Sequence, residues 1–301
     1  MTRLRENDIA LISPTLSCYD HEQATLVGAD YVRLAQLAAG MSEPLEPDPS
    51  PLVAIVPVTS GEGLLGGFSE AVRNILVCCG ARPHITNGHD VTGLSEAVRS
   101  QPALVFIADD DTCIAFAPGC QAISDNSAAT GKGFAMAMHR MIVADASQAD
   151  ASQADGSQAG ASQAMSDDVP RILVLGAGPV GTAAACALSR MGYRLVVHDI
   201  DKSRGAALAD ACQAELADGP VSYRQFKNIL DATNTGPFIG AEDLQDETNL
   251  VAPGIPLCVG KDAAAKARLY HNPLELGIAT MYFDCLQQMS AAVEPHRPEK
   301  G

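Results

Sequence analysis

The stretch that decides the fold is Ile172-Leu-Val-Leu-Gly-Ala-Gly-Pro-Val-Gly181. Its aliphatic run predicts a buried strand, and its glycines follow the spacing G-x-G-x-x-G just before an alanine-rich segment that predicts a helix. Gly176 permits a tight turn, Gly178 allows a phosphate group to approach the backbone, and Gly181 allows the helix to pack closely on the strand. This strand–turn–helix unit predicts a dinucleotide-binding Rossmann domain.

The predicted helix begins at Pro179 and Val180, directly after the second glycine. The first N–H groups of a helix have no partner within the helix, and the helix dipole adds partial positive charge at the same end. Both features favour a bound phosphate. A glycine-rich turn without a ligand is the alternative, and the aliphatic strand before the turn and the acid after it argue against that alternative.

The next predicted strand, residues 194–198, leads into Asp199, which follows Gly181 by 18 residues. A carboxylate at this place accepts hydrogen bonds from the adenosine ribose hydroxyls of a dinucleotide. It also repels the 2′-phosphate of NADP, so NAD is the predicted cofactor. Arg204 lies close by in the sequence, and a cation there leaves NADP open as an alternative.

Two later segments are expected to line the nicotinamide end of the cofactor. The first contains Thr233 and Asn234 and follows a short predicted strand at 229–232. The second contains Pro253 and Gly254 and follows a predicted strand at 249–252. In open α/β sheets ligands bind at the carboxyl ends of the strands. Either segment is also compatible with a plain turn.

Predicted strands and helices alternate along both halves of the chain, as is typical of α/β proteins with a parallel or mixed sheet. We predict two α/β domains: an N-terminal substrate domain over residues 1–144 and a Rossmann-like, doubly wound parallel sheet over residues 169–273. A last helix within 274–301 is expected to pack back on the first domain. In the first domain the predicted strands are 52–58, 83–86 and 103–108, and the predicted helices are 68–79, 94–100 and 126–143.

A five-residue repeat separates the two predicted domains. Asp145-Ala-Ser-Gln-Ala149 recurs with small changes in four consecutive copies that end at Ala164. The residues are small and polar, and a five-residue period buries no helix or strand face, so they offer little to offset the entropy of ordering. We predict a disordered linker over residues 145–168, with some helical tendency from its alanines.

The overall composition narrows the class of partner. The net charge of −16 disfavours nucleic acids and anionic membranes, which require a basic face. No apolar run approaches the roughly 18 residues that span a bilayer, and we expect a cytoplasmic protein. The nine cysteines show no paired spacing, so neither a metal site nor a disulfide framework is predicted. A small cationic substrate such as an amine suits the acidic chain, and a homodimer is compatible with the sequence.

Polar residues follow the predicted strands of the first domain. They lie at 59–69, at 109–111 and at 125–133. None of these segments ends in the GK[ST] of a phosphate-binding loop, which excludes a nucleoside triphosphate site. A carboxylate at a strand end, such as Asp109, is suited to bind a substrate amine, and a hydroxyl such as that of Ser60 is suited to bind a polar end. The candidate substrate-binding residues are Ser60, Glu62, Asp109 and Asn126, with Asp109 and Ser60 as the candidate catalytic pair.

At these residues the chain resembles the pyrrolysine synthase family. The resemblance spans residues 52–285 and omits the repeat. Its most specific element is the Thr-Ser-Gly-x-Gly loop combined with an Ala-Asp-Asp run. It rests on Val56-Pro-Val-Thr-Ser-Gly61, Ala108-Asp-Asp110, Asn126 with Thr130-Gly131, Ala252-Pro-Gly-Ile-Pro256 and Pro273-Leu-Glu-Leu-Gly277.

The resemblance implies a reaction. The substrate would be L-lysine acylated on its ε-nitrogen by 3-methyl-D-ornithine, and NAD would oxidise the carbon that bears the terminal ornithine amine. The resulting imine would hydrolyse to a semialdehyde, and the ornithine α-amine would close the ring. The resemblance also implies that Leu4, in an N-terminal helix, folds over the substrate.

Two other functions stay open from the sequence. One is another NAD-dependent amino-acid or hydroxy-acid dehydrogenase of the same architecture, which a panel of substrates would reveal. The other is a non-catalytic module that senses NAD, which would bind the dinucleotide without reducing it. A Ser–His–Asp hydrolase is excluded because the chain has no G-x-S-x-G motif.

Overall fold

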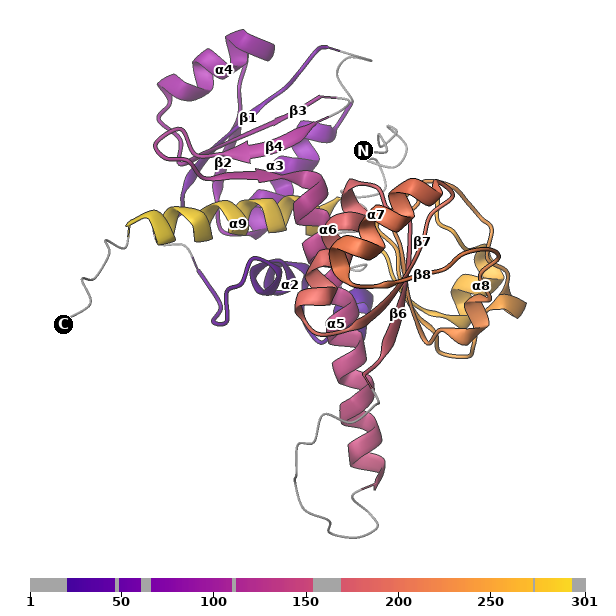
Figure 1. The fold of residues 1–301 in the computed structure, drawn as a ribbon. Coiled ribbons are helices and arrows are strands. Elements are labelled where there is room, and N and C mark those ends of the chain that lie inside the picture. The colour runs from indigo at the N-terminus through magenta and orange to yellow at the C-terminus, as the bar shows by residue number, and fades with distance from the viewer. Residues whose placement is uncertain are drawn as a thin grey trace, which may run out of the picture.

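The computed structural model describes residues 21–46, 49–60, 66–109, 112–153, 169–272 and 274–293. Over these residues the chain forms two α/β domains, each built on its own sheet (Figure 1). The predicted fold class is therefore confirmed. Among the described residues, no helix is both long enough and apolar enough to cross a membrane.

The N-terminal domain contains a mixed sheet of five strands in the order β2-β1-β3-β4-β5. β1 pairs in parallel with β2 and β3, whereas β3, β4 and β5 pair antiparallel. The elements up to this point are α2 (Tyr31–Ala38), β1 (Leu52–Val56), α3 (Phe68–Cys78), β2 (Arg82–Ile85), α4 (Asp90–Arg99), β3 (Leu104–Ala108), β4 (Cys113–Phe116) and β5 (Ile123–Asp125).

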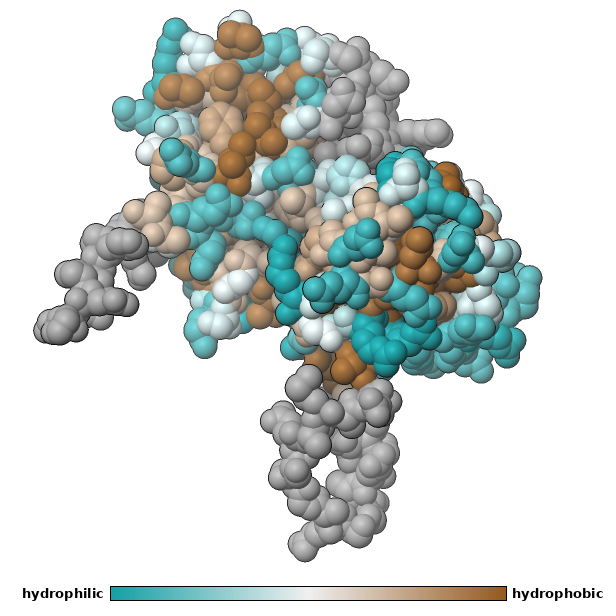
Figure 2. Space-filling model, viewed as in Figure 1, coloured by the Kyte–Doolittle hydropathy of each residue, from teal (hydrophilic) through white to brown (hydrophobic). Residues whose placement is uncertain are grey.

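The strands of this sheet alternate between two apolar faces. Val53 and Ile55 belong to the large core with α3, whereas Ala54 and Val56 belong to a small cluster under α4. The α4 face is thinly covered, since Ile123 on β5 is 54% exposed and Val91 on α4 is 80% exposed. Figure 2 shows hydrophobic side chains gathered on the visible surface of this domain.

The C-terminal domain contains six parallel strands in the order β11-β10-β9-β6-β7-β8. The chain runs outward from β6 to β8 and then returns to β9 on the other side of β6, which is the strand order of the Rossmann fold. The elements are β6 (Arg171–Leu175), α6 (Pro179–Arg190), β7 (Arg194–His198), α7 (Lys202–Cys212), β8 (Glu215–Leu216), η1 (Tyr223–Gln225), β9 (Asn228–Asp231), η2 (Ala241–Asp243), β10 (Asn249–Val251), α8 (Lys261–Lys266) and β11 (Arg268–Tyr270).

A long helix, α5 (Asn126–Gln153), joins the two domains and packs against both. Glycines in α5 allow the neighbouring helices to approach it closely. A Cβ atom on Gly131 would lie 2.6 Å from Ala183 of α6, and one on Gly133 would lie 2.7 Å from Leu276 of the last helix. α5 also continues past residue 144, the predicted domain end, because the first repeat copies extend it to Gln153.

The polar contacts of Asp145 fix the far half of α5 on the C-terminal sheet. The carboxylate of Asp145 accepts a hydrogen bond of 2.8 Å from the side-chain amide of Asn249 and forms an ion pair with Arg268. The same Asn249 amide also donates to Asn228. The first residue of the repeat is therefore part of the folded structure.

The last helix, α9 (Glu275–Val293), follows β11 but packs on the N-terminal domain (Figure 1). Its polar side holds β5: the side chain of Gln288 accepts a hydrogen bond from the N–H of Ile123 and donates one to its carbonyl. Asp284 of α9 also accepts a hydrogen bond of 2.8 Å from Ser124. The chain thus crosses twice between the domains, through α5 and through the return to α9.

Candidate functional site

The glycine turn after β6 has the geometry that a dinucleotide-binding turn requires. Gly176 has a φ of +91°, which side-chain-bearing residues rarely adopt. A Cβ atom on Gly181 would lie 1.9 Å from the carbonyl oxygen of Gly176, so only glycine fits there. A Cβ atom on Gly178 would meet nothing within 4 Å, so the backbone at this point faces open space. Pro179 then opens α6, with Val180 in its first turn.

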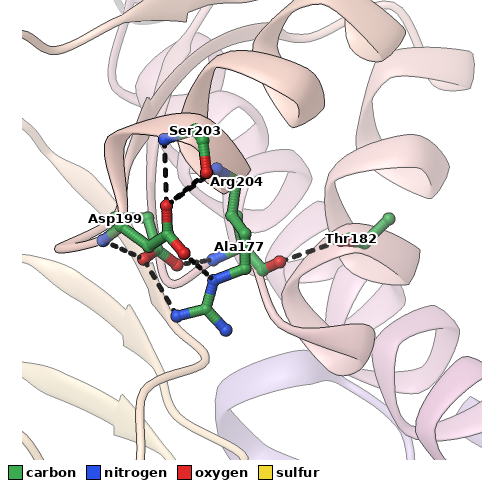
Figure 3. A network of polar contacts seen from close by, with 6 residues as sticks. Ala177, Thr182, Asp199, Ser203 and Arg204 are labelled. Carbon is green, nitrogen blue, oxygen red and sulfur yellow. Dashed lines mark hydrogen bonds and ion pairs between the residues drawn. The ribbon is translucent and has the colours of Figure 1, made fainter.

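Asp199, at the end of β7, holds this turn (Figure 3). Its Oδ2 atom accepts a hydrogen bond of 2.6 Å from the N–H of Ala177, and its Oδ1 atom accepts one of 2.7 Å from the N–H of Asp201. The side chain is only 6% exposed. Each oxygen of Asp199 therefore already accepts a backbone N–H, a role that sequence reasoning did not foresee.

Arg204 lies beside two carboxylates at this end of the sheet. Its guanidinium is 3.5 Å from Asp199 and 3.2 Å from Asp201. Hydrogen bonds from Ser203 and Arg204 hold the pKa of Asp201 below its usual value. Two carboxylates around one guanidinium leave a net negative charge, which repels a further phosphate.

The loops after β9 and β10 are packed against each other. A Cβ atom on Gly254 would lie 2.2 Å from the carbonyl oxygen of Thr233, so the two loops approach at backbone distance. Pro253 is half-buried at this contact, whereas Asn234 is exposed. Both loops begin at the carboxyl edge of the C-terminal sheet, the edge that also carries the glycine turn.

Asp231, the last residue of β9, organises the first of these loops. It is fully buried, and its Oδ1 atom accepts hydrogen bonds from both the N–H and the hydroxyl of Thr233, at 3.1 and 2.7 Å. Burial raises the pKa of Asp231, and hydrogen bonds from Thr233 and Cys258 oppose that shift. Thr233 therefore has a fixed side chain that points back into the loop.

The candidate substrate residues of the N-terminal domain share one edge of its sheet. Ser60 follows β1 and Asp109 follows β3, its parallel neighbour, while Asn126 follows β5, which runs in the same direction. Ser60 and Asp109 are exposed and Asn126 is half-buried. The Oδ1 atom of Asp109 accepts a hydrogen bond of 2.7 Å from the N–H of Thr112. Leu4 and Glu62 lie outside the described residues.

Asp90 holds the loop that leads to Ser60, a role that the sequence analysis missed. Its carboxylate accepts hydrogen bonds from both the N–H and the hydroxyl of Thr59, the first of them 2.8 Å long. These bonds lower the pKa of Asp90. Asp90 and Thr59 are 31 residues apart in the chain, so no local pattern links them.

A hollow of about 280 Å³ lies beside Asp109. Its wall is mostly apolar, and the acidic residues Asp90 and Asp109 are part of the lining. An apolar wall with carboxylates is suited to an aliphatic chain that ends in an ammonium group. The lining residues are Val58, Asp90, Val91, Leu94, Ile107, Ala108, Asp109, Thr112 and Ile114.

The starts of α5 and α9 meet beside the domain junction. A Cβ atom on Gly277 of α9 would lie 2.5 Å from the hydroxyl of Thr130 and 2.9 Å from the side-chain oxygen of Asn126. Glu275, in the first turn of α9, is 3% exposed. The side chain of Asn126 is therefore confined by α9. The buried carboxyl group of Glu275 belongs to the same turn of α9 as Gly277.

His271 closes the carboxyl edge of the C-terminal sheet. Its Nδ1–H donates a hydrogen bond of 2.6 Å to the carbonyl of Ala252, the residue before Pro253. Burial lowers the pKa of His271, and the bond to Ala252 partly opposes that shift. The ring thus holds the end of β10 through its bond to Ala252.

Comparisons with known proteins identify the family. The sequence pattern described as "Pyrrolysine biosynthesis protein PylD, N-terminal domain" matches residues 9–123. The pyrrolysine synthase of Methanosarcina acetivorans is 30% identical over 239 residues, which cover 78% of this chain and 82% of that protein. The chain belongs to the pyrrolysine synthase family. A second member, the pyrrolysine synthase of Methanosarcina barkeri, is 26% identical over 95% of this chain and 98% of its own.

Solved structures similar to this pyrrolysine synthase family member are more distant. Quinate dehydrogenase from Corynebacterium glutamicum, solved with NAD, covers 80% of this chain and 94% of its own at 14% identity and a TM-score of 0.48. Shikimate 5-dehydrogenase from Thermus thermophilus, solved with shikimate, covers 80% of this chain and 98% of its own at 17% identity and a TM-score of 0.45.

Proposed function

We propose that this chain is an NAD-dependent dehydrogenase that forms pyrrolysine from L-lysine acylated on its ε-nitrogen by 3-methyl-D-ornithine. The main support for the proposal is that this member of the pyrrolysine synthase family has a glycine turn suited to bind a dinucleotide. Gly178 faces open space at the start of α6, and Asp199 fixes the turn beside it. Bound there, NAD supplies a hydride acceptor.

The residues of the turn are suited to hold the cofactor. The backbone around Gly178, Pro179 and Val180 would hold the pyrophosphate at the N-terminus of α6. The loops that contain Thr233 and Gly254 would bind the nicotinamide end, because they lie on the same edge of the sheet. These contacts depend mainly on backbone groups, so they require the loops to keep their shape.

NAD is favoured over NADP by the charges at the end of β7. The two carboxylates of Asp199 and Asp201 and the single guanidinium of Arg204 together carry a net negative charge, and a 2′-phosphate would add to it. Repulsion between like charges within a few ångströms costs about 1 kcal/mol or more at a protein surface. We therefore expect NADP to bind at least fivefold more weakly than NAD.

The substrate would bind across the edge of the N-terminal sheet. The carboxylate of Asp109 would bind the ammonium group of the substrate, and the hydroxyl of Ser60 would hydrogen-bond one of its polar ends. The apolar hollow beside Asp109 suits the methylene chain of the substrate. Loss of hydride requires a neutral amine, and Asp109 is placed on an exposed edge from which a proton can pass to water.

The net reaction would remove two hydrogens and one ammonia. Oxidation of the carbon that bears the terminal amine gives an imine, water converts the imine to a semialdehyde with release of ammonia, and the ornithine α-amine closes the ring with loss of water. The chain needs to orient the amine and exclude competing substrates, since positioning is the main contribution of a protein to this chemistry.

Mass spectrometry of the product tests this function. The full-length protein is incubated with the lysyl–ornithine amide and NAD, and we expect a product lighter than the substrate by two hydrogens and one ammonia. Reduction of NAD by a simple amino acid or hydroxy acid, but not by the amide, would instead support the alternative dehydrogenase. Tight binding of NAD without reduction by any of these substrates would support a sensing module and overturn the proposal.

A further inference from the structure

α6 and α7 each carry one cysteine where the two helices meet. The Sγ atom of Cys186 on α6 lies 3.5 Å from the Sγ atom of Cys212, the last residue of α7. Both residues are free thiols. Because a disulfide bond is about 2.05 Å long, the sulfur atoms need to approach by about 1.5 Å to form one.

We propose that Cys186 and Cys212 form a reversible disulfide, a modification site whose oxidant is a small-molecule disulfide such as oxidised glutathione. The site belongs to the dinucleotide-binding domain but is separate from the glycine turn and from the substrate edge. The formation of this disulfide therefore does not depend on the proposed function.

The two thiols differ in a way that sets the order of the reaction. Cys186 is half-buried, whereas Cys212 is only 7% exposed. Burial, together with the hydrogen bond to Cys186, raises the pKa of Cys212 to about 11. The accessible thiol of Cys186 is thus the one that meets the oxidant first, and Cys212 is the resolving thiol that completes the exchange.

The exchange is balanced in atoms and electrons. The Cys186 thiolate attacks one sulfur of the oxidant, forms a mixed disulfide and expels the other half as a thiolate. The Cys212 thiolate then attacks the Cys186 sulfur, forms the intramolecular bond and expels the second thiolate. The two cysteines lose two protons and two electrons, and the oxidant is reduced to two thiols.

The surroundings of the pair already restrain the helix ends. The hydroxyl of Ser189 on α6 donates a hydrogen bond of 3.1 Å to the carbonyl of Cys212, so the end of α7 is held against α6 without the disulfide. Because the helix ends are already held together, we expect rotation of the two side chains to bring the sulfurs within bonding distance. The new bond would enclose β7 and α7 up to its last residue, the segment that contains Asp199 and Arg204.

Peptide mapping tests the site directly. The full-length protein is incubated with oxidised glutathione, alkylated and digested with trypsin. Cleavage after Arg and Lys places Cys186 alone in residues 172–190 and Cys212 alone in residues 205–224. We expect these two peptides to appear linked, at a mass two hydrogens below their sum, and to separate again on reduction.

A shift in thermal stability gives the second readout. Closing a loop of this length constrains the unfolded chain, so oxidation is expected to raise the Tm of the C-terminal domain by roughly 5 °C or more, and reduction should reverse the rise. The Cys186→Ser variant is expected to lose both the linked peptides and the shift. The Cys120→Ser variant, which removes an exposed cysteine elsewhere, should keep both.

Two results would overturn the proposal. One is the recovery of Cys186 and Cys212 in separate, unlinked peptides under conditions in which exposed Cys78 and Cys120 are already glutathionylated. The other is a disulfide that joins Cys186 to a different cysteine. Either result would mean that Cys186 and Cys212 do not form a disulfide with each other.

Discussion

The carboxylate of Asp199 accepts a hydrogen bond of 2.6 Å from the backbone N–H of Ala177, 22 residues earlier in the chain. Ala177 lies inside the glycine turn, between Gly176 and Gly178, so the end of β7 fixes the shape of the turn after β6. A second backbone N–H, that of Asp201, occupies the other carboxylate oxygen. If the turn binds the cofactor as proposed, Asp199 would contribute to binding by fixing the turn as well as through any contact with the ribose.

The Asp199→Asn variant is expected to weaken NAD binding. An amide keeps the size of the side chain but replaces one acceptor oxygen with a donor, which faces a backbone N–H. Hydrogen bonds to charged groups contribute about 1.5–3 kcal/mol, so the Kd for NAD should rise about 10- to 150-fold in a calorimetric titration. Asp218→Asn is the control, because that carboxylate is 75% exposed and pairs with exposed Lys202. An unchanged Kd in a folded Asp199→Asn protein would contradict the cofactor site.

The Asp109→Asn variant is expected to lower turnover but spare NAD affinity. Asn retains the oxygen that accepts the N–H of Thr112, so the turn is kept while the charge is lost. If the carboxylate binds the substrate ammonium, kcat/KM should fall at least about tenfold, which corresponds to about 1.4 kcal/mol. Asp30→Asn is a matched control, since Asp30 is exposed and accepts an equivalent bond from Arg33. Full activity in the Asp109 variant would remove this residue from the site.

The Gly131→Ala variant is expected to destabilise the junction of α5 and α6. An added Cβ atom would lie 2.6 Å from the carbonyl oxygen of Val180 and 2.7 Å from the N–H nitrogen of Ala184, and backbone atoms cannot move aside cheaply. Overpacking of this kind costs about 1–3 kcal/mol, measured as the free energy of unfolding in urea. Gly119→Ala is the control because its Cβ would meet no atom within 4 Å. A rise in stability, as expected from helix propensity alone, would refute the close contact.

Stability is expected to fall below pH 6.5 in a way that depends on His271. Burial lowers the pKa of this ring in the folded state, so the unfolded chain takes up the proton first as the pH falls. The folded state then loses stability from about pH 6.5 down to the lowered pKa, with a slope of at most about 1.4 kcal/mol per pH unit.

Urea unfolding at pH 7.5 and at pH 5.5 measures this effect. The His271→Asn variant, whose amide can still donate to the carbonyl of Ala252, should lose less stability between the two values than the parent protein. The His21→Asn variant removes an exposed histidine and should behave like the parent. An identical pH dependence in all three proteins would mean that His271 does not titrate differently on folding.

The Rossmann domain was predictable because its signals are local. β7 begins and ends at the predicted residues 194 and 198, and the aliphatic run that starts at Ile172 lies within β6, since a glycine or acidic boundary follows each of these runs. β4 and β5 were missed, and the mixed character of the N-terminal sheet comes from them. Strands of four and three residues carry almost no periodic signal, and their pairing depends on β3 and on each other.

The candidate site was predictable in position and less so in detail. Residues at the ends of parallel strands, such as Gly176 and Asp199, follow from the strand order once the strands are known. The partners of these residues do not, because they are distant in sequence. The bond from Thr59 to Asp90 spans 31 residues, and the approach of Gly277 to Asn126 depends on the chain returning from one domain to the other.

The fixed position of Asp145 separates the repeat into two parts with different consequences for evolution. The first aspartate is bonded to Asn249 and Arg268, and the residues from it to Gln153 continue α5 away from the domain junction (Figure 1). Replication slippage that adds or deletes a later five-residue copy would change the length of the connection by one unit and leave every contact of the two sheets in place. We therefore expect a change in the number of later copies to be tolerated more readily than the loss of Asp145.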